Sequence, residues 1–266
     1  MLYATAEFPR SHGFCNRLFP WARMELFSQR TGCRILAPRW SSWFKIGPYL
    51  RGEKDKRHYF QQCSNTGYIC GCRRFALLSV FNHIPEHSAL TAGGKDGKYV
   101  VVFSGYDGYF SPLSGHSSFL ASRLEAIAHA RIKMALRLFP DLPFIGVHIR
   151  RSDFKQAGLV ISDDWYIRAI GAAKELAGNG LPVRIFTDAQ PNELNTIRRA
   201  FSSVEIMPQR AALLDMLLLS KSTVLVGTSC STFSMWASFL GGQSNIWHAD
   251  KPPDEGACAV PPVLLR

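Results

Sequence analysis

The second half of the sequence alternates short apolar stretches with segments of helical periodicity, and this alternation limits the possible folds more than any other feature. Strands are predicted at 144–149, 183–187, 204–207, 223–227 and 245–248, the last of these being the final strand. Helices are predicted between them at 163–177, 191–201, 212–222 and 231–242. Such alternation forms βαβ units and a parallel sheet with helices on both faces. Ligands bind beyond the carboxyl ends of the strands in sheets of this kind.

The first half is less regular. Strands are predicted at 2–7, 34–38 and 98–105, and a helix at 19–32 that ends at a glycine. One long amphipathic helix, capped by Ser117 or Ser118, is predicted at 117–139 and leads into the second half. We therefore place the domain boundary near Pro140, which gives domains of residues 1–139 and 140–266. Residues 40–75 are aromatic and basic and receive no assignment.

Charge is concentrated near the start of the chain. The net charge is +11, and residues 1–75 hold 13 Lys and Arg against 4 Asp and Glu, a local net charge of +9. Such a surface attracts phosphates, nucleic acid, anionic glycans or anionic lipid, although a solvated basic face without a partner has the same composition. Seven scattered cysteines favour a reducing compartment. With no membrane-length apolar run and no signal-peptide pattern at the start, we expect a cytoplasmic protein.

Polar side chains follow each of the central predicted strands. The stretch "VHIRRSDF" (147–154) places Arg150 and Arg151 directly after a buried strand, and Asp153 two residues later. Guanidinium groups bind two oxygens at once, so this pair suits a diphosphate. A surface salt bridge at a strand end is the alternative. "FTDAQP" (186–191) supplies Thr187 and Asp188, whose carboxylate suits ribose hydroxyls.

Further candidates lie at two predicted helix starts and within one apolar helix. "GTSCSTFSMW" (227–236) places Ser231 and Thr232 at a helix N-terminus, where hydroxyls and free N–H groups form an anion site. "HGFCNRLFPWA" (12–22) offers Gly13 and Asn16 ahead of another helix. Asp215 lies in the apolar "LLDMLLLS" and needs partners. Those partners are either the N–H groups of a guanine edge or an arginine of the protein itself.

Three of these segments together resemble one enzyme family. "GFCNRLFPWARMELFSQRTG" resembles the opening motif of the α1,2-fucosyltransferases, "VHIRRSDF" resembles their arginine motif, and "DMLLLSKSTVLVGTSCSTFSMWASFLGG" resembles their third motif. All three occur in family order across residues 13–242. The α1,6- and protein O-fucosyltransferases share the arginine motif in related form. The chain departs from the pattern at several positions, which are Cys15, Arg17, Pro20, Ser152, Cys230 and Met235.

The resemblance implies an α/β protein of the GT-B class, with two Rossmann-like domains facing across a cleft. The C-terminal domain would hold GDP-fucose and the N-terminal domain the acceptor. Arg150 and Arg151 are the catalytic candidates: Arg150 would neutralise the leaving diphosphate, while Arg151 and Asp153 would organise the loop. His148 and Asp215 would lie near the guanosine. The other donor-binding positions are Ser231, Thr232 and Phe233 at the phosphates, and Gly13 and Asn16 from the other domain.

Transfer from a sugar diphosphate builds charge on the departing phosphate. Enzymes that neutralise this charge with a metal usually present paired carboxylates, and no Asp-x-Asp follows a strand here. Arginines and a helix dipole perform the same task. We therefore expect inversion at the sugar without a metal or other cofactor. Glu7 and His12, near the first strand end, are the candidate bases.

The sequence thus predicts a fucosyltransferase that uses GDP-fucose to modify a glycan hydroxyl, with α1,2 transfer to a galactoside implied by the resemblance. Two alternatives stay open: a transferase for another GDP-sugar, or a non-catalytic protein that binds polyanions or nucleic acid through the basic segment. The expected partners are a GDP-sugar and a glycan acceptor, with peripheral contact to the inner face of an anionic membrane and no nucleic acid.

Overall fold

The computed structural model describes residues 2–6, 13–35, 82–85, 99–178 and 180–266. The chain forms two compact units, Met1–Asp107 and Gly108–Arg266. This division differs from the predicted domain boundary near Pro140, because the helices that precede Pro140 pack against helices of the second unit.

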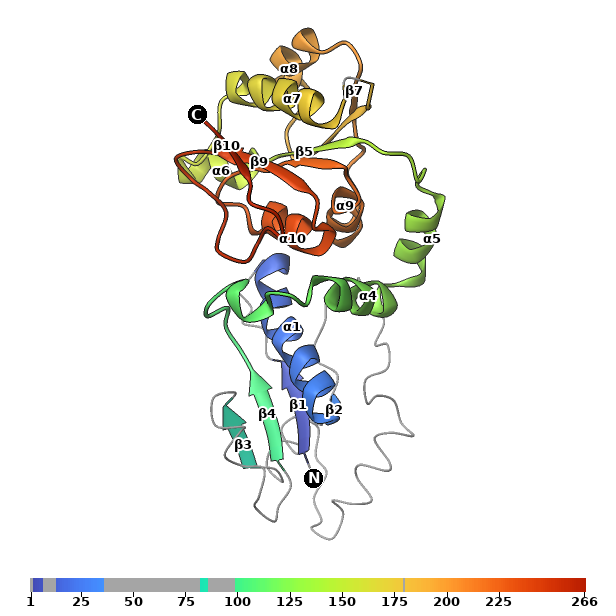
Figure 1. The fold of residues 1–266 in the computed structure, drawn as a ribbon, viewed down its shortest axis with the longest axis vertical. Coiled ribbons are helices and arrows are strands. Elements are labelled where there is room, and N and C mark those ends of the chain that lie inside the picture. The colour runs from blue at the N-terminus through green and yellow to red at the C-terminus, as the bar shows by residue number, and fades with distance from the viewer. Residues whose placement is uncertain (1, 7–12, 36–81, 86–98, 179) are drawn as a thin grey trace. The chain divides into compact units, whose positions relative to one another are not determined.

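The first unit contains, among its described residues, a parallel sheet in the order β2-β1-β4-β3 (Figure 1). Its strands are β1 (Leu2–Ala6), β2 (Arg34–Ile35), β3 (Asn82–Pro85) and β4 (Tyr99–Phe103). Helix α1 (Phe14–Thr31) packs on β1 and β4 and ends at Gly32 in the left-handed conformation. Strands β1 and β4 confirm the predictions for those segments.

Helix α1 begins five residues before the predicted start at Phe19, so Pro20 lies inside it. Proline is tolerated in the first turn of a helix and disfavoured in the interior. Beyond Pro20 the helix is held by Arg23, whose guanidinium donates to the main-chain oxygens of Ser104 at 2.6 Å and Asp107 at 3.1 Å. These bonds tie α1 to the chain after β4.

The second unit is built on a parallel sheet in the order β10-β9-β8-β5-β6-β7. The strands are β5 (Ile145–Ile149), β6 (Val183–Thr187), β7 (Val204–Ile206), β8 (Val224–Val226), β9 (Ser244–His248) and β10 (Val263–Leu265). The five predicted strands are all confirmed. Prediction was wrong in ending the sheet at β9, since β10 adds a further parallel strand beside it.

Helices cover both faces of this sheet (Figure 1). Helix α7 packs on β5, β8 and β9 over one face, and α9 and α10 lie on the other. The helices and 3-10 turns of the unit are η2 (Ser111–Leu113), α4 (Ser117–Ile127), α5 (Ala130–Leu138), α6 (Ser152–Ala157), α7 (Asp163–Ala177), η3 (Pro191–Leu194), α8 (Asn195–Ala200), α9 (Ala212–Leu219) and α10 (Thr232–Gly241). The predicted doubly covered parallel sheet is confirmed.

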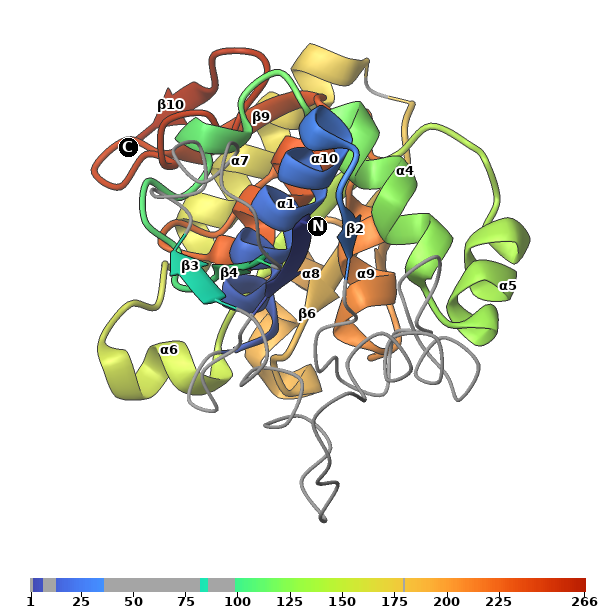
Figure 2. The ribbon, with the colours of Figure 1, turned by 90° about the horizontal axis from the view of Figure 1, so that it is seen from below.

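The single helix predicted at 117–139 is wrong, because two helices occupy that segment (Figure 2). The chain is extended at Ala128 and His129, and the His129 ring accepts a hydrogen bond from the amide of Arg131 as it caps α5. α4 then packs on α10, while α5 packs on α9. The predicted caps Ser117 and Ser118 lie inside α4, which begins after His116.

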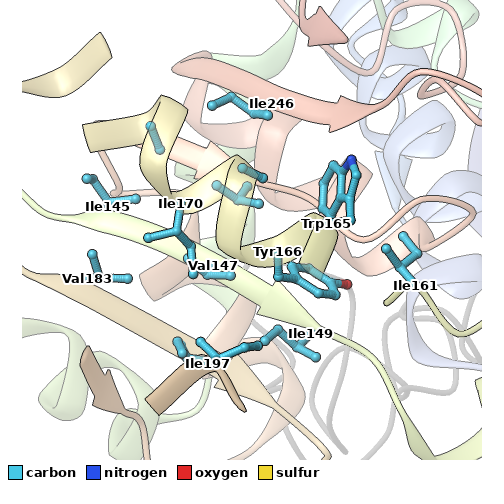
Figure 3. Packing of buried hydrophobic residues seen from close by; sticks show 14 of the residues in the cluster. Ile145, Val147, Ile149, Ile161, Trp165, Tyr166, Ile170, Val183, Ile197 and Ile246 are labelled. Atoms are coloured by element: carbon cyan, nitrogen blue, oxygen red, sulfur yellow. The ribbon is translucent and has the colours of Figure 1, made fainter. Parts of the chain in front are cut away.

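The core of the second unit lies between the sheet and α7 (Figure 3). Ile145 and Val147 of β5 pack against Trp165, Tyr166 and Ile170 of α7, and all five side chains are buried. Because side chains alternate along a strand, the residues between them on β5 point to the opposite face, toward α9 and α10. Among the described residues no helix is both long and apolar enough to cross a bilayer.

Candidate functional site

The order of the strands defines where a ligand can bind to the second unit. From β5 the chain moves outward through β6 and β7, then returns to the other side of β5 for β8, β9 and β10. The strand order therefore reverses between β5 and β8, and such a switch point at the carboxyl edge is where ligands bind in open parallel sheets. The segments that follow β5, β6 and β8 carry the predicted strand-end residues to this edge.

Arg150 follows β5 and lies between two carboxylates. Its Nε donates to Asp153 Oδ1 at 2.7 Å, and its Nη1 lies 3.1 Å from Asp188 Oδ2. The Arg150 side chain is 35% exposed and Asp153 63%, whereas Asp188 is only 15% exposed. The guanidinium of Arg150 keeps the pKa of Asp153 below its usual value. The half-buried carboxylate of Asp188 therefore orients the arginine, while the exposed carboxylate of Asp153 forms a weaker contact that water screens.

Asp188 organises the whole turn after β5. One of its oxygens accepts the amide of Arg151 at 2.7 Å, and the other accepts the hydroxyl of Ser152. Burial raises the pKa of Asp188, but the bonds from Ser152 and Arg151 and the charge of Arg150 outweigh it and lower the pKa. Its oxygens are thus already bonded within the protein, to partners other than the ribose hydroxyls that the sequence suggested.

Thr187, the last residue of β6, closes the neighbouring turn. Its hydroxyl donates to the main-chain oxygen of Ile149 at 2.8 Å and accepts the amide of Ala189 at 3.0 Å. The Thr187 side chain joins the ends of β5 and β6 and thereby fixes the backbone position of Asp188, the next residue.

Arg151 points into the protein, away from the carboxylates that hold its neighbour. It is only 4% exposed, and its guanidinium donates to the main-chain oxygen of Ile161 and to Asp163. It also lies 5.5 Å from the centre of the Tyr166 ring. Every one of these partners belongs to the segment at the start of α7, so Arg151 anchors the turn after β5 to that helix.

His148 lies on the opposite face of β5 from the α7 core and meets α10. Its Nδ1 is 2.6 Å from the hydroxyl of Ser234, and its ring lies 4.7 Å from that of Phe233. Burial is the main reason that the pKa of His148 falls to about 3, and the positive charge of Arg150 lowers it further. The histidine is therefore neutral at physiological pH. These contacts bring Phe233 to the same edge of the sheet as Arg150.

The segment between β8 and α10 presents the N-terminus of α10 at this edge. Ser231 caps the helix, with its hydroxyl accepting the amide of Ser234. Thr232 and Phe233 are the first two residues of the helix and are half-buried. The residue before the cap, Cys230, has φ +60°. The start of α10 follows β8, the strand that pairs with β5. Anion binding at this helix start stays a prediction.

Asp215 lies in the first turn of α9 beside Arg210. The Arg210 amide donates to Oδ2 at 3.3 Å, and the guanidinium Nη1 is 3.7 Å from Oδ1, too far for a hydrogen bond. Both of these side-chain atoms are buried without a hydrogen-bond partner among the described residues. Burial outweighs the charge of Arg210 and raises the pKa of Asp215 to about 6. The sequence left two possible partners for Asp215, an arginine of the protein or a guanine edge. The structure shows Arg210 beside it, without a hydrogen bond between the guanidinium Nη1 and Oδ1.

The remaining predicted site residues belong to the first unit or lie outside the description. Gly13 directly precedes α1, and Asn16 lies in its first turn with Oδ1 buried and unpartnered among the described residues. Glu7 and His12, the candidate bases, lie outside the described residues. The structure therefore places His148, Arg150, Asp188 and Phe233 at one edge of the second sheet, and the candidates of the first unit stay predictions.

Two further observations concern other kinds of site. A hollow of about 210 Å³ opens at the opposite, amino edge of the second sheet, lined by residues that include Phe139, Phe144 and Lys221. It is remote from the strand-end residues and contains none of them. Within the described ranges, no group of three or more His, Cys, Asp or Glu side chains is placed to hold a metal ion.

Comparison with known proteins gives matches among solved structures. No family model matches the sequence, and no curated protein matches it. The fucosyltransferase NodZ from Bradyrhizobium aligns with a TM-score of 0.54 and 18% identity, over 90% of this chain and 92% of that chain. POFUT1 in complex with GDP aligns with a TM-score of 0.51 and 14% identity, over 89% and 93%. A mutant of Arabidopsis thaliana FUT1 in complex with GDP gives 0.52 and 14%, over 95% and 71%.

At such low identity the likeness concerns the fold. It extends over both halves of the chain, and it includes a structure of NodZ soaked with GDP-fucose, at a TM-score of 0.52. The α/β GT-B class expected from the sequence is confirmed: this chain has the fold of these fucosyltransferases.

Proposed function

We propose that this protein is a glycosyltransferase that moves fucose from GDP-fucose to a hydroxyl group of a glycan acceptor. The observation that carries the proposal is the position of Arg150. This residue follows β5 at the switch point of the sheet and is held there by Asp188. The neighbouring strand, β8, leads into α10. The fold shared with fucosyltransferases solved with GDP or GDP-fucose supports the choice of donor. The motif resemblance supports α1,2 transfer to a galactoside.

The chemistry assigned to these residues is electrostatic. In the proposed single displacement, the acceptor oxygen bonds to the anomeric carbon, the bond from that carbon to the phosphate oxygen breaks, and the configuration inverts. GDP leaves with the bonding electrons, and Arg150 and the amides at the start of α10 stabilise its added charge. The acceptor proton passes to a base, for which Glu7 and His12 remain candidates. No metal is required in this scheme.

Other residues position this machinery. Arg151, Ser152, Asp188 and Thr187 fix the turn that presents Arg150, and their contacts are with the protein. Asp153 pairs with Arg150 at an exposed position. We propose that a diphosphate displaces this contact, since an exposed ion pair contributes about 0–1 kcal/mol. Asp215 and Arg210 leave two buried polar atoms unpaired, which the N–H and carbonyl groups of a guanine edge would complete.

Calorimetric titration of GDP, UDP and ADP tests the nucleotide, and turnover of a panel of GDP-sugars tests the sugar. We expect clear preference for GDP and fastest turnover of GDP-fucose. Equal or absent binding of the three nucleotides argues against the proposal. A faster reaction with another GDP-sugar supports the alternative of a different donor on the same scaffold.

A non-catalytic polyanion-binding protein is the second candidate, favoured by the net charge of +9 in residues 1–75. That alternative expects nucleic-acid affinity that falls steeply with salt, together with no affinity for GDP. Measuring both ligands on one preparation separates the two functions.

We also propose peripheral contact with an anionic membrane, where lipid-linked acceptors reside. Helix α5 supports this partner, because it carries Arg131, Lys133 and Arg137 and no acidic residue. Met134 and Leu138, one turn apart on α5, are 62% and 76% exposed. Exposed apolar side chains among basic ones are typical of helices that lie in a lipid interface. Flotation with vesicles that contain anionic lipid should carry the protein upward, and equal flotation with neutral vesicles contradicts the proposal.

A further inference from the structure

Two branches of buried hydrogen bonds converge on His148. The first joins its ring, because Nδ1 lies 2.6 Å from the hydroxyl of Ser234. The second joins its main chain, since the hydroxyl of Thr228 donates to the carbonyl oxygen of His148 at 2.6 Å. Ser234 and Thr228 are both completely buried, so water does not compete for these bonds. The network therefore determines how the histidine is held.

The direction of each bond follows from the number of protons available. The hydroxyl of Thr228 gives its single proton to the carbonyl of His148, so it accepts from the Tyr166 hydroxyl, 2.9 Å away. Ser234 Oγ accepts the amide of Thr228 at 3.0 Å. The proton of the buried Ser234 hydroxyl also needs an acceptor, and the Nδ1 of His148 lies within reach. A Ser234 hydroxyl that donates to Nδ1 makes Nδ1 an acceptor and requires the ring proton to be on Nε2.

We propose that Ser234 is a positioning residue that fixes His148 as the neutral tautomer protonated on Nε2, so that Nε2 donates a hydrogen bond to an oxygen of the bound nucleoside diphosphate. The ligand in this inference rests on the proposed function. Among the hydrogen bonds of the described residues, none uses Nε2. Burial and Arg150 lower the pKa of His148 to about 3, which Asp188 opposes only in part, so the ring stays neutral at working pH.

The tautomer matters because it decides what the ring presents to an anion. With the proton on Nε2, the ring offers an N–H group to a phosphate or ribose oxygen. With the proton on Nδ1, the same position offers a lone pair, which repels a negative oxygen. Phe233 lies 4.7 Å from the imidazole ring and limits its rotation. The hydroxyl of Ser234 therefore decides whether Nε2 of His148 attracts or repels an anionic oxygen, although Ser234 does not itself contact that oxygen.

The tautomer can be observed directly in the full chain without any ligand. Protein labelled with ¹⁵N-histidine gives two-bond ¹H–¹⁵N correlations that distinguish the tautomers, and the His148 signal is the one that the His148→Gln variant lacks. We expect the pattern of the Nε2-protonated form, unchanged between about pH 5.5 and about pH 8.5. Signals of the Nδ1-protonated form, or titration near the ordinary histidine pKa, would overturn the proposal.

Variants of Ser234 test its control of the ring. Ser234→Ala removes the proton that Nδ1 accepts, so we expect a mixture of tautomers, while Ser234→Thr keeps the hydroxyl and should keep the Nε2-protonated form. An unchanged spectrum in Ser234→Ala contradicts the role of Ser234. The wild-type spectrum decides the tautomer even where a variant fails to fold.

Affinity for GDP tests what the ring does. Glutamine places its amide nitrogen near the position of Nε2, and asparagine near that of Nδ1, so we expect His148→Gln to retain at least about tenfold more GDP affinity than His148→Asn. Equal losses in both variants overturn donation from Nε2. A wild type that has the predicted tautomer but binds no nucleotide overturns the ligand and the proposed function, while the positioning of His148 by Ser234 stands.

Discussion

Asp188 holds Arg150 in place, because its Oδ2 lies 3.1 Å from Nη1 of the arginine across the ends of two adjacent strands. The same carboxylate accepts the Arg151 amide and the Ser152 hydroxyl. Asp188, itself half-buried, thus fixes both the start of the turn and the direction of the Arg150 guanidinium. The position of Arg150, on which the proposed chemistry depends, is therefore set by residues that need not touch the donor.

Asp188→Asn should weaken GDP binding and slow transfer. Asparagine preserves the acceptor for the Arg151 amide but removes the charge that orients Arg150. A hydrogen bond to a charged group contributes about 1.5–3 kcal/mol, which is roughly tenfold to a hundredfold in affinity. Asp153→Asn is the matched control, because Asp153 touches the same guanidinium at an exposed position. If the Asp153 variant loses as much affinity as the Asp188 variant, Asp188 has no special role.

Arg150→Ala and Arg151→Ala should fail in different ways. Loss of Arg150 should abolish transfer, by several kcal/mol of transition-state stabilisation, with little change in the free energy of unfolding. Arg151→Ala leaves Asp163 and the Ile161 carbonyl without their donor and should lower that free energy by about 2–3 kcal/mol. Urea unfolding and donor turnover measure the two quantities. Near-normal turnover in Arg150→Ala contradicts its assigned role.

The pH dependence of GDP affinity tests Asp215. An ionised carboxylate accepts N–H donors on both oxygens, whereas protonation removes the charge and turns one oxygen into a donor. Burial raises the pKa of Asp215 to about 6. As the pH falls below that value the proton competes with the guanine edge, so affinity should drop by up to about tenfold per pH unit. Asp215→Asn should bind GDP more weakly near neutral pH and lose this dependence. The same pH slope in wild type and variant excludes Asp215 as the responsible group.

Strands and helices with clear boundaries were predictable from the sequence. α7 has the predicted limits, because Ser162 caps it through the amide of Trp165 and Gly178 follows its last residue. β6 also has its predicted limits. The break at Ala128 was not predictable, since apolar spacing continues through it and the His129 cap requires knowledge of the turn. β10 spans only three residues, too few to show a period.

Site residues were predictable where a charged side chain directly follows an apolar strand. They were not predictable where their role depends on a partner far away in the sequence. Arg150 and Asp188 stand out as charges after apolar runs. Ser152, Ser234 and Tyr166 do not, because their positions in the sequence are typical of a turn and of helix interiors. Their roles follow from pairing across segments, such as the contact of Ser234 with a histidine 86 residues away. Such pairs need the folded structure, since the spacing along the chain carries no signal for them.

Gly146→Ala should damage both stability and the site. A β-carbon at Gly146 would lie 2.8 Å from side-chain atoms of Leu219 and Ser222, so the strand must shift or α9 must move away. Overpacking of this kind costs about 1–3 kcal/mol. Because Gly146 lies two residues before His148 on β5, a shift of the strand also displaces the histidine. We therefore expect weaker GDP binding together with a lower urea midpoint.

Gly171→Ala is the matched control, because Gly171 lies inside α7 with open space where its β-carbon would be. Alanine is the better helix former by about 1 kcal/mol, so this variant should be slightly more stable than wild type and should bind GDP normally. The contrast isolates the packing of β5 against α9 from the mere addition of a methyl group. Equal urea midpoints and equal GDP affinities in the two variants would mean that β5 and α9 do not approach as closely as the structure has them.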